Sequence, residues 1–247
     1  MEATAPPPPP PPAGEPPTSG GQPPPTGGQP PPSASQPPGG AGYPVTFAVD
    51  YPDRPLNRVS TFFRIFAAIP ILILADAVTG AVLRYPAGGH TYTVFVGGAG
   101  ILFIPPLLML LFRKKYPWWW LEWNRHLTRF LNRVYVYLAL MDDRYPSTDD
   151  EQSVHYDFRN PDAERDLSRG LPLVKWFLAI PHYIVLFFLE IAAFIVIIVA
   201  WFAILFTGRY PRGMFDFVEG VQRWHNRVAG YAFLLVTDQY PPFSLQP

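Results

Sequence analysis

Residues 171–206 read LPLVKWFLAIPHYIVLFFLEIAAFIVIIVAWFAILF, the longest apolar stretch of the chain. Its ionisable side chains are Lys175, His182 and Glu190. As one helix the stretch would be about 54 Å long, which exceeds the roughly 30 Å of a bilayer's hydrocarbon core. We therefore expect two membrane spans, 171–189 and 191–207, joined by a tight turn near Leu189–Ala192. A single long or broken helix remains the alternative, because no Gly or Pro marks the proposed turn.

Two further stretches are apolar enough to span a membrane. Residues 61–83 contain only Arg64 and Asp76 as ionisable side chains, and residues 92–112 contain none. The sequence therefore predicts a mainly helical, polytopic membrane protein with four transmembrane helices in two hairpins. Of the 19 Lys and Arg residues, only Arg84 lies between two paired spans. Under the positive-inside rule, the ends of each hairpin and both chain termini are then cytoplasmic.

The composition fits a membrane protein with a polar extension. Hydrophobic residues make up 49% of the chain and charged residues 15%, whereas about a quarter of a soluble domain is charged. The net charge of zero argues against a strongly basic nucleic-acid binder. The absence of Cys excludes thiolate metal sites and thiol catalysis. We therefore expect no nucleic-acid partner, no metal and no cofactor.

The amino-terminal segment, residues 1–42, is of a different kind. It holds 17 of the 33 prolines together with Gly, Ser, Thr, Ala and Gln, and its only charges are Glu2 and Glu15. Such a segment cannot bury enough apolar surface to offset the entropy lost on ordering. We expect a disordered, proline-rich cytoplasmic tail that serves as a solvating spacer or as a docking arm for a partner.

The remaining chain contains one unit twice, as residues 43–147 and 148–247. At an offset of 111, the matched pairs are Arg54 and Arg165, Arg58 and Arg169, Arg64 and Lys175, and Pro70 and Pro181. At an offset of 94, they include Tyr116 and Tyr210, Arg129 and Arg223, Asn132 and Asn226, and Tyr137 and Tyr231. The difference of 17 indicates an insertion in the first unit around Arg84–Gly100. We expect parallel repeats related by an axis along the membrane normal.

Each unit is also expected to carry a cytoplasmic collar. Short stretches of alternating polarity precede the spans, at Val45–Asp50 and Val154–Phe158. The segments that follow the spans, Trp118–Arg133 and Met214–Arg227, have the polar spacing of amphipathic helices that lie at an interface. Residues 134–140 and 231–236 come next, and their β-branched and aromatic content favours strands, although a continued helix is the alternative. Up to four short strands are then available for a small cytoplasmic sheet.

Three segments carry a resemblance to a known family. They are Leu171–Leu186, Phe206–Pro211 with the sequence FTGRYP, and Thr237–Phe243 with the sequence TDQYPPF. They are similar to a bacterial integral membrane family catalogued as a domain of unknown function, of the 4389 type, and the resemblance covers about residues 43–245. It implies a bacterial plasma-membrane location, often with a proline-rich amino-terminal extension, and it carries no activity to transfer.

The first unit departs from this pattern in two places. It has Ile71 where the second unit has His182, and Arg113-Lys-Lys115 where the second unit has Thr207-Gly-Arg209.

Ionisable residues within the spans are candidate functional residues, because charge is costly in hydrocarbon. Arg64 and Lys175 fall early in their spans, so their long stems either reach the headgroups or find a partner inside the protein. His182 either bonds to a freed backbone carbonyl or forms a proton or ligand site. Pro70 and Pro181 are expected to kink their helices, which either eases packing or marks a pathway across the pseudo-axis.

The cytoplasmic flanks supply candidates for lipid contact. The arginines Arg54, Arg58, Arg165 and Arg169 recur in an R-x-L-[N/S]-R pattern, and they are candidates for binding anionic headgroups or for pairing with nearby carboxylates. Tryptophans cluster at a predicted helix end, as in an aromatic belt, and the expected interface anchors are Trp118, Trp119, Trp120 and Trp123.

No phosphate-binding loop, metalloprotease motif, nucleophile elbow or dinucleotide fingerprint occurs. The leading hypothesis is therefore a non-enzymatic integral membrane protein that acts as a scaffold or accessory subunit of a bacterial membrane or envelope assembly. Its partners would be the bilayer, possible anionic lipids, and a membrane protein or a second copy of the chain. One alternative is a small transporter or channel acting as an oligomer, and another is an anionic-lipid-binding protein.

Overall fold

The computed structural model describes residues 42–79, 81–87, 90–96, 98–148 and 150–247. The predicted tail, residues 1–42, lies outside the described residues except for Gly42. The described chain is mainly helical, as predicted. Its helices are α1 Arg58–Thr79, α2 Gly98–Arg113, α3 Trp118–Leu138, α4 Lys175–Leu178, α5 Ile180–Thr207 and α6 Arg212–Ala232, with a short 3-10 turn η1 at Leu171–Leu173. Its strands are β1 Val45–Val49, β2 Ala81–Ala87, β3 His90–Val96 and β4 Val154–Phe158.

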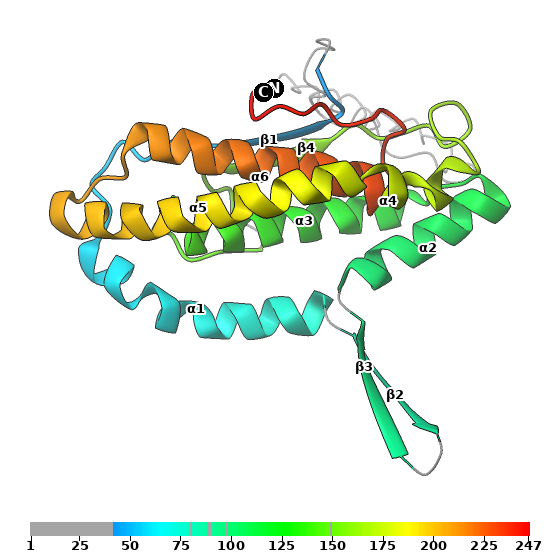
Figure 1. Cartoon of the computed structure of the whole chain (residues 1–247), viewed down its shortest axis with the longest axis horizontal. Helices are drawn as coiled ribbons and strands as arrows, with labels where there is room; N and C mark the ends of the chain where they lie inside the picture. The colour runs from blue at the N-terminus through cyan, green and yellow to red at the C-terminus, as the bar shows by residue number, and fades with distance from the viewer. Residues whose placement is uncertain (1–41, 80, 88–89, 97, 149) are drawn as a thin grey trace, which may run out of the picture.

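The elements form three layers (Figure 1). Strands β1 and β4 pair with each other and pack on α6 and α3, respectively. On their other side, these two helices contact the apolar helices, α6 against α5 and α3 against α1. The main core lies between the layers and includes Phe47 of β1, Val221 of α6 and Ile204 of α5. The β2–β3 hairpin projects from the junction of α1 and α2 (Figure 1).

The β1–β4 sheet follows the alternating polarity of its two strands. In β1, Val45, Phe47 and Val49 are buried and the residues between them are exposed, and β4 shows the same alternation. The strands are antiparallel, with Phe47 opposite Tyr156. A side chain changes faces at every step along a strand, so one face covers the helices and the other is polar. The predicted small sheet is thus present at these two stretches.

The two other predicted collar strands were wrong. Helix α3 runs on to Leu138, so the helical alternative holds for most of residues 134–140, whereas α6 ends at Ala232 and residues 233–236 are in neither a helix nor a strand. Val134 and Val136 are buried along α3, which shows that packing on one helical face overrode their β-propensity. Each helix is followed by a leucine with positive φ, 64° at Leu140 and 56° at Leu235, where the chain turns back.

The prediction of two spans within residues 171–207 was also wrong. After η1 and α4, a single helix, α5, continues from Ile180 to Thr207. No Gly or Pro interrupts it after Pro181, and the proposed turn contains helix-compatible residues. Ala193 and Ala200 are buried on the side that faces α6, where their small size allows close approach. Gly208 ends the helix in the left-handed conformation, with φ of 75°.

The first unit differs from its predicted spans as well. Helix α1 ends at Thr79, and residues 90–96, most of which were assigned to the second span, form strand β3. The predicted insertion around Arg84–Gly100 falls on the β2–β3 hairpin. In the described part of the chain, two helices are long and apolar enough to cross a membrane, Arg58–Asp76 and Ile180–Thr207, and the apolar part of α2 is shorter. The four predicted membrane helices are therefore not confirmed.

Candidate functional site

Arg64 does not extend outward from α1 but is buried, with 2% of its surface exposed. Its Nη1 donates hydrogen bonds to the carbonyl oxygens of Tyr137, at 3.1 Å, and of Asp142. The guanidinium also lies over the Tyr137 ring, 4.3 Å from its centroid. Arg64 thus joins the start of α1 to the turn that follows α3. Of the two predicted alternatives for Arg64, headgroup contact or a partner inside the protein, the structure shows the partner inside the protein.

Lys175 occupies the matched position at the start of α4, and it is fully buried. Its Nζ donates to the carbonyl oxygen of Thr237 at 2.7 Å and lies 2.7 Å from Oδ1 of Asp238. It also lies over the Tyr231 ring, 5.1 Å from the centroid. Burial and the nearby Asp238 carboxylate raise the pKa of Tyr231, which keeps its hydroxyl neutral. A buried cation is tolerated here because a carboxylate, a carbonyl and a ring surround it.

The carboxylates that follow α3 and α6 also act in matching ways. Oδ2 of Asp143 accepts a hydrogen bond from the backbone N–H of Asn57 at 3.3 Å. Oδ2 of Asp238 accepts one from the backbone N–H of Ser168 at 2.7 Å. Asn57 and Ser168 are 111 residues apart, the same offset as Arg64 and Lys175. In both units the carboxylate therefore holds the segment that leads into the apolar helix.

A buried polar pair joins α3 and α6. Nδ2 of Asn132 donates to Oδ1 of Asn226 at 3.0 Å, and Nδ2 of Asn226 donates to Oδ1 of Asn132 at 2.8 Å. Gln222 adds a third bond, from its Nε2 to Oδ1 of Asn132 at 2.8 Å. All three side chains are buried. These asparagines occupy matched positions in the two units, and that match is the only signal in the sequence that points to them; it does not predict that they are in contact.

Two further matched residues bind the sheet across the units. Arg129 of α3 donates to the carbonyl oxygen of Tyr156 in β4, with Nε at 3.3 Å. Arg223 of α6 donates from Nε to the carbonyl oxygen of Phe47 in β1 at 2.9 Å. Tyr156 and Phe47 face each other in the sheet. Each strand is therefore held by the helix of the other unit, which interlocks the two units.

His182 is fully buried at the start of α5. Its Nδ1 accepts a hydrogen bond from the indole N–H of Trp224 at 3.0 Å, and its ring stacks on Phe243 with centroids 4.0 Å apart. An indole nitrogen can only donate, so the imidazole is neutral with its proton on Nε2. Among the described residues, Nε2 has no hydrogen-bond partner. The partner of His182 is therefore a side chain of α6 and not a freed backbone carbonyl.

The two prolines sit in different places in their helices. Pro70 lies inside α1, whereas Pro181 lies in the first turn of α5, just after α4 ends at Leu178. The first turn has no intrahelical acceptor for a backbone N–H, so a proline there costs little. The break before α5 coincides with Ala179, at a helix junction rather than within a continuous span.

The four collar arginines divide into two kinds. Arg54 pairs with Asp143, with Nη1 3.2 Å from Oδ2, and Arg165 lies 3.6 Å from Asp162. Arg58 and Arg169 are exposed, and neither has a hydrogen-bond or ion-pair partner among the described residues. Arg58 is the first residue of α1 and Arg169 lies two residues before η1, so both lie where the apolar segments begin. They are the free members of the set.

The predicted anchors form an aromatic cluster in the first turns of α3. The rings of Trp119 and Trp120 are 5.5 Å apart, and those of Trp120 and Trp123 are 5.1 Å apart. Trp118, Trp119 and Trp123 are exposed, while Trp120 is half-buried. A cluster of this kind suits a boundary between water and an apolar phase.

Many apolar side chains are exposed on α1, α4 and α5, and we call them together the apolar surface. In α1 the exposed apolar residues are Val59, Phe62, Phe63, Ile65, Phe66, Ile69, Leu72, Ile73 and Leu74. In α4 and α5 they are Trp176, Phe177, Leu178, Ile180, Ile184, Val185, Phe187, Phe188, Ile191, Phe194, Ile195, Ile198, Val199, Phe202 and Phe206. A soluble monomer rarely exposes large apolar patches, and such patches generally mark sites that contact another apolar phase or a partner.

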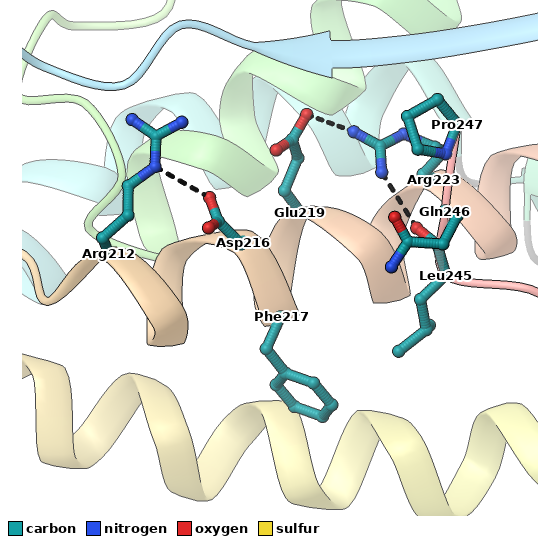
Figure 2. A pocket seen from close by; sticks show the side chains of 8 residues that line it. All are labelled: Arg212, Asp216, Phe217, Glu219, Arg223, Leu245, Gln246 and Pro247. Carbon is teal, nitrogen blue, oxygen red and sulfur yellow. Dashed lines mark hydrogen bonds and ion pairs between the residues drawn. The ribbon is translucent and has the colours of Figure 1, made fainter.

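A pocket of about 420 Å³ lies beside α6 and the last residues of the chain (Figure 2). Arg212 pairs with Asp216, with Nε 3.1 Å from Oδ1, and Arg223 pairs with Glu219. Arg223 also donates to the carbonyl oxygen of Leu245 at 2.9 Å. Because its charges are paired with one another, the pocket does not indicate a ligand of particular charge. The described residues also contain no group of three or more His, Asp or Glu side chains that could hold a metal ion.

The second unit is similar to a known protein family. Residues 172–244 match the model described as Domain of unknown function (DUF4389). The matched range contains Lys175, His182 and Asn226 with the partners described above. No curated protein and no solved structure matched the chain. Residues 172–244 are thus similar to the family of the domain of unknown function DUF4389.

Proposed function

We propose that this chain is a non-enzymatic protein of the bacterial plasma membrane that acts as a scaffold or accessory subunit. The observation that carries the proposal is the exposed apolar surface of α1, α4 and α5, which needs an apolar phase to cover it. On the other side of the molecule, the β1–β4 sheet presents a polar face to the cytoplasm. The tail is attached next to this sheet, since β1 begins three residues after Gly42.

The interior polar residues support binding rather than catalysis. Arg64 and Lys175 are occupied by carbonyl oxygens, and Asn132 and Asn226 are occupied by each other. These contacts fasten helices and strands and leave the outer surfaces for interaction. The transporter alternative has less support, because His182 is enclosed by Trp224, Tyr240 and Phe243.

We also propose that the two units are structural repeats. Matched residues make matched contacts at Arg64 and Lys175 and at Asp143 and Asp238. The insertion that separates the two offsets falls on the β2–β3 hairpin, whereas α5 runs through the corresponding point. An axis through the Asn132–Asn226 pair would relate the units and place both apolar segments on one side.

A photoreactive residue at a single position tests the scaffold proposal. Lysine-directed crosslinkers are poorly suited, because Lys114, Lys115 and Lys175 are the only lysines. We would place benzoylphenylalanine at the exposed sheet residue Ala48 and, as the control, at Phe187 of α5, and irradiate native membranes. The proposal predicts a protein adduct of defined mass from Ala48 and chiefly lipid adducts from Phe187. Absence of any protein adduct from Ala48 would contradict it.

Anionic-lipid binding is a second function that a specific observation favours. Arg58 and Arg169 are exposed and free at the two points where apolar segments begin. A cation in that place can meet a headgroup while the adjacent helix meets the acyl chains. Binding to vesicles with and without phosphatidylglycerol tests this function, and equal binding to both would exclude it.

A further inference from the structure

We infer that the apolar surface is embedded in a single leaflet, with the long axis of α5 parallel to the membrane plane, so that the protein lies on the membrane and does not cross it. This inference rests on the membrane association proposed above. It states that α1, α4 and α5 contact one leaflet, and it takes the place of the predicted hairpins that cross the bilayer.

The continuity of α5 gives the first argument. Basic residues flank both of its ends, with Arg165 and Arg169 before it and Arg209 and Arg212 after it. A hairpin would return both flanks to the cytoplasmic side, but an uninterrupted helix that crossed the bilayer would place one basic flank outside. The positive-inside rule disfavours that arrangement. A helix lying in the plane keeps both flanks on the same side.

The partner helix of α5 gives the second argument. Helix α6 lies alongside α5 along its length (Figure 1), from Ile204 and Phe215 in one cluster to Ala179 and Ala232 in another. Charged residues occur throughout α6: Arg212, Asp216, Glu219, Arg223 and Arg227. If α5 crossed the bilayer, α6 would carry these groups through the hydrocarbon with it, which is costly. With α5 in the plane, α6 stays on the aqueous side.

The middle of α5 gives the third argument. Glu190 lies near its midpoint, and its Oε1 is 3.2 Å from Nδ1 of His225 on α6. Both side chains are partly exposed, 37% for Glu190 and 53% for His225. At the centre of a crossing helix this polar pair would face acyl chains. On the flank of a helix lying in the plane it faces headgroups and water.

The layer order gives the fourth argument. Helix α6 separates β1 from α5: its Arg223 binds the strand and its Trp224 binds His182 (Figure 2 shows the strand, α6 and α5 in this order). The outer face of the sheet bears polar residues such as Thr46 and Asp157. An orientation with α5 along the membrane normal would bring this polar face against lipid. An in-plane orientation puts it in water and puts the free Arg58 at headgroup level.

Depth measurements on α5 test the inference directly. The chain has no Cys, so a nitroxide can be placed at single introduced cysteines in the full chain, reconstituted in phosphatidylcholine–phosphatidylglycerol vesicles. The four labelled positions on the exposed side of α5 are Ile184, Ile191, Ile198 and Phe206. Asp157→Cys on the sheet is the aqueous control. Oxygen and nickel-complex accessibility then give the depth of each label.

The inference predicts that the four α5 labels lie at one depth to within about 3 Å, the rise of two helical residues. If α5 crosses the bilayer, Ile191 lies about 10 Å deeper than Ile184, and Phe206 lies near the opposite surface. That result overturns the inference and leaves membrane association intact. Labels that are all as accessible to nickel as the Asp157 control would overturn the membrane proposal itself.

A sidedness measurement gives an independent check. Gly170 and Gly213 have open space around their α-carbons, so cysteine fits at each, and they flank α4–α5 on either end. The inference predicts that an impermeant thiol reagent labels both Gly170→Cys and Gly213→Cys in inverted vesicles and neither in intact cells. Labelling of just one of them in intact cells would show that α5 crosses and would overturn the inference.

Discussion

Residues 58–113 and residues 169–207 cover matching stretches of the two units, yet their paths differ. The first is divided into α1, the β2–β3 hairpin and α2, whereas the second runs through α4 and an uninterrupted α5. Their starting points, in contrast, are held alike, by Arg64 in one and Lys175 in the other. The two units therefore share the polar contacts at the start of the apolar segment, and we infer that these contacts are the structurally constrained feature. The middle of that segment accepts an insertion.

The strongest test of this comparison is to remove the two buried cations separately. Lys175→Met leaves the Asp238 carboxylate without its cation, so we expect a loss of about 3 kcal/mol in unfolding free energy. Arg64→Met leaves carbonyl oxygens unpaired, and we expect a loss of about 2 kcal/mol. Denaturant titration in detergent micelles measures both.

Arg169→Met is the matched control for the two cation variants. Its side chain is exposed and free, so its effect should stay within about 0.5 kcal/mol. If Lys175→Met and Arg64→Met were no more destabilising than this control, the two starting points would not be the constrained feature.

The pair on the proposed axis should couple the units. Asn132→Leu or Asn226→Leu alone leaves the buried amide of the other asparagine without this partner, which should lower the unfolding free energy by about 1–3 kcal/mol. The double variant removes both amides, so its cost should be below the sum of the single costs by at least about 0.5 kcal/mol. Strict additivity in the double-mutant cycle would show that the contact is not an energetic link between units.

Deleting residues 80–96 removes the 17 residues that distinguish the two paths, leaving α1 joined to α2 as one segment. We expect the protein to stay folded, with an unfolding free energy changed by about 1 kcal/mol or less, because connection length has a weak effect. Far-ultraviolet circular dichroism should retain the helical signal. The control deletes residues 184–200 of α5, which removes buried Leu186 and Ala193, and it should abolish folding. Equal damage from both deletions would contradict the comparison.

The smallest expected effect is on lipid binding. Arg58→Ala and Arg169→Ala should each lower affinity for vesicles containing phosphatidylglycerol about 5-fold, which corresponds to about 1 kcal/mol per basic residue. The difference should shrink in high salt. Arg159→Ala, an exposed arginine at the end of β4, is the control and should leave affinity unchanged. A loss at only one of the two sites would show that the units contact lipid unequally.

Local patterns in the sequence located most elements. Alternating polarity found β1 and β4, and helical spacing found α3 and α6. The prediction of two spans failed because a bilayer rule was applied to a local question: residues 171–207 were divided at Leu189–Ala192 because their length exceeded the hydrocarbon thickness. The hydrocarbon thickness limits the length of a helix only if the helix crosses the membrane. No residue within this stretch interrupts the helix.

The polar contacts could not be predicted from the sequence, for a different reason. Arg64 and Lys175 bind backbone carbonyl oxygens that are 73 and 62 residues away in sequence. Every residue has a backbone carbonyl, so the sequence does not indicate which one a buried cation binds. Asn132 and Asn226 were visible as matched positions, but their meeting depends on how α3 and α6 pack. Recurrence in both units marked these residues without indicating their partners.

Alkaline carbonate extraction of bacterial membranes tests whether the exposed face of α5 contacts lipid. The variant carries Phe187→Glu, Phe194→Glu and Phe202→Glu, and the control carries three glutamates on the sheet face, at Thr46, Ala48 and His155. We predict that the unmodified chain and the control stay in the membrane pellet while the α5 variant is released into the supernatant with its helical signal intact. An α5 variant retained as fully as the unmodified chain would contradict the account.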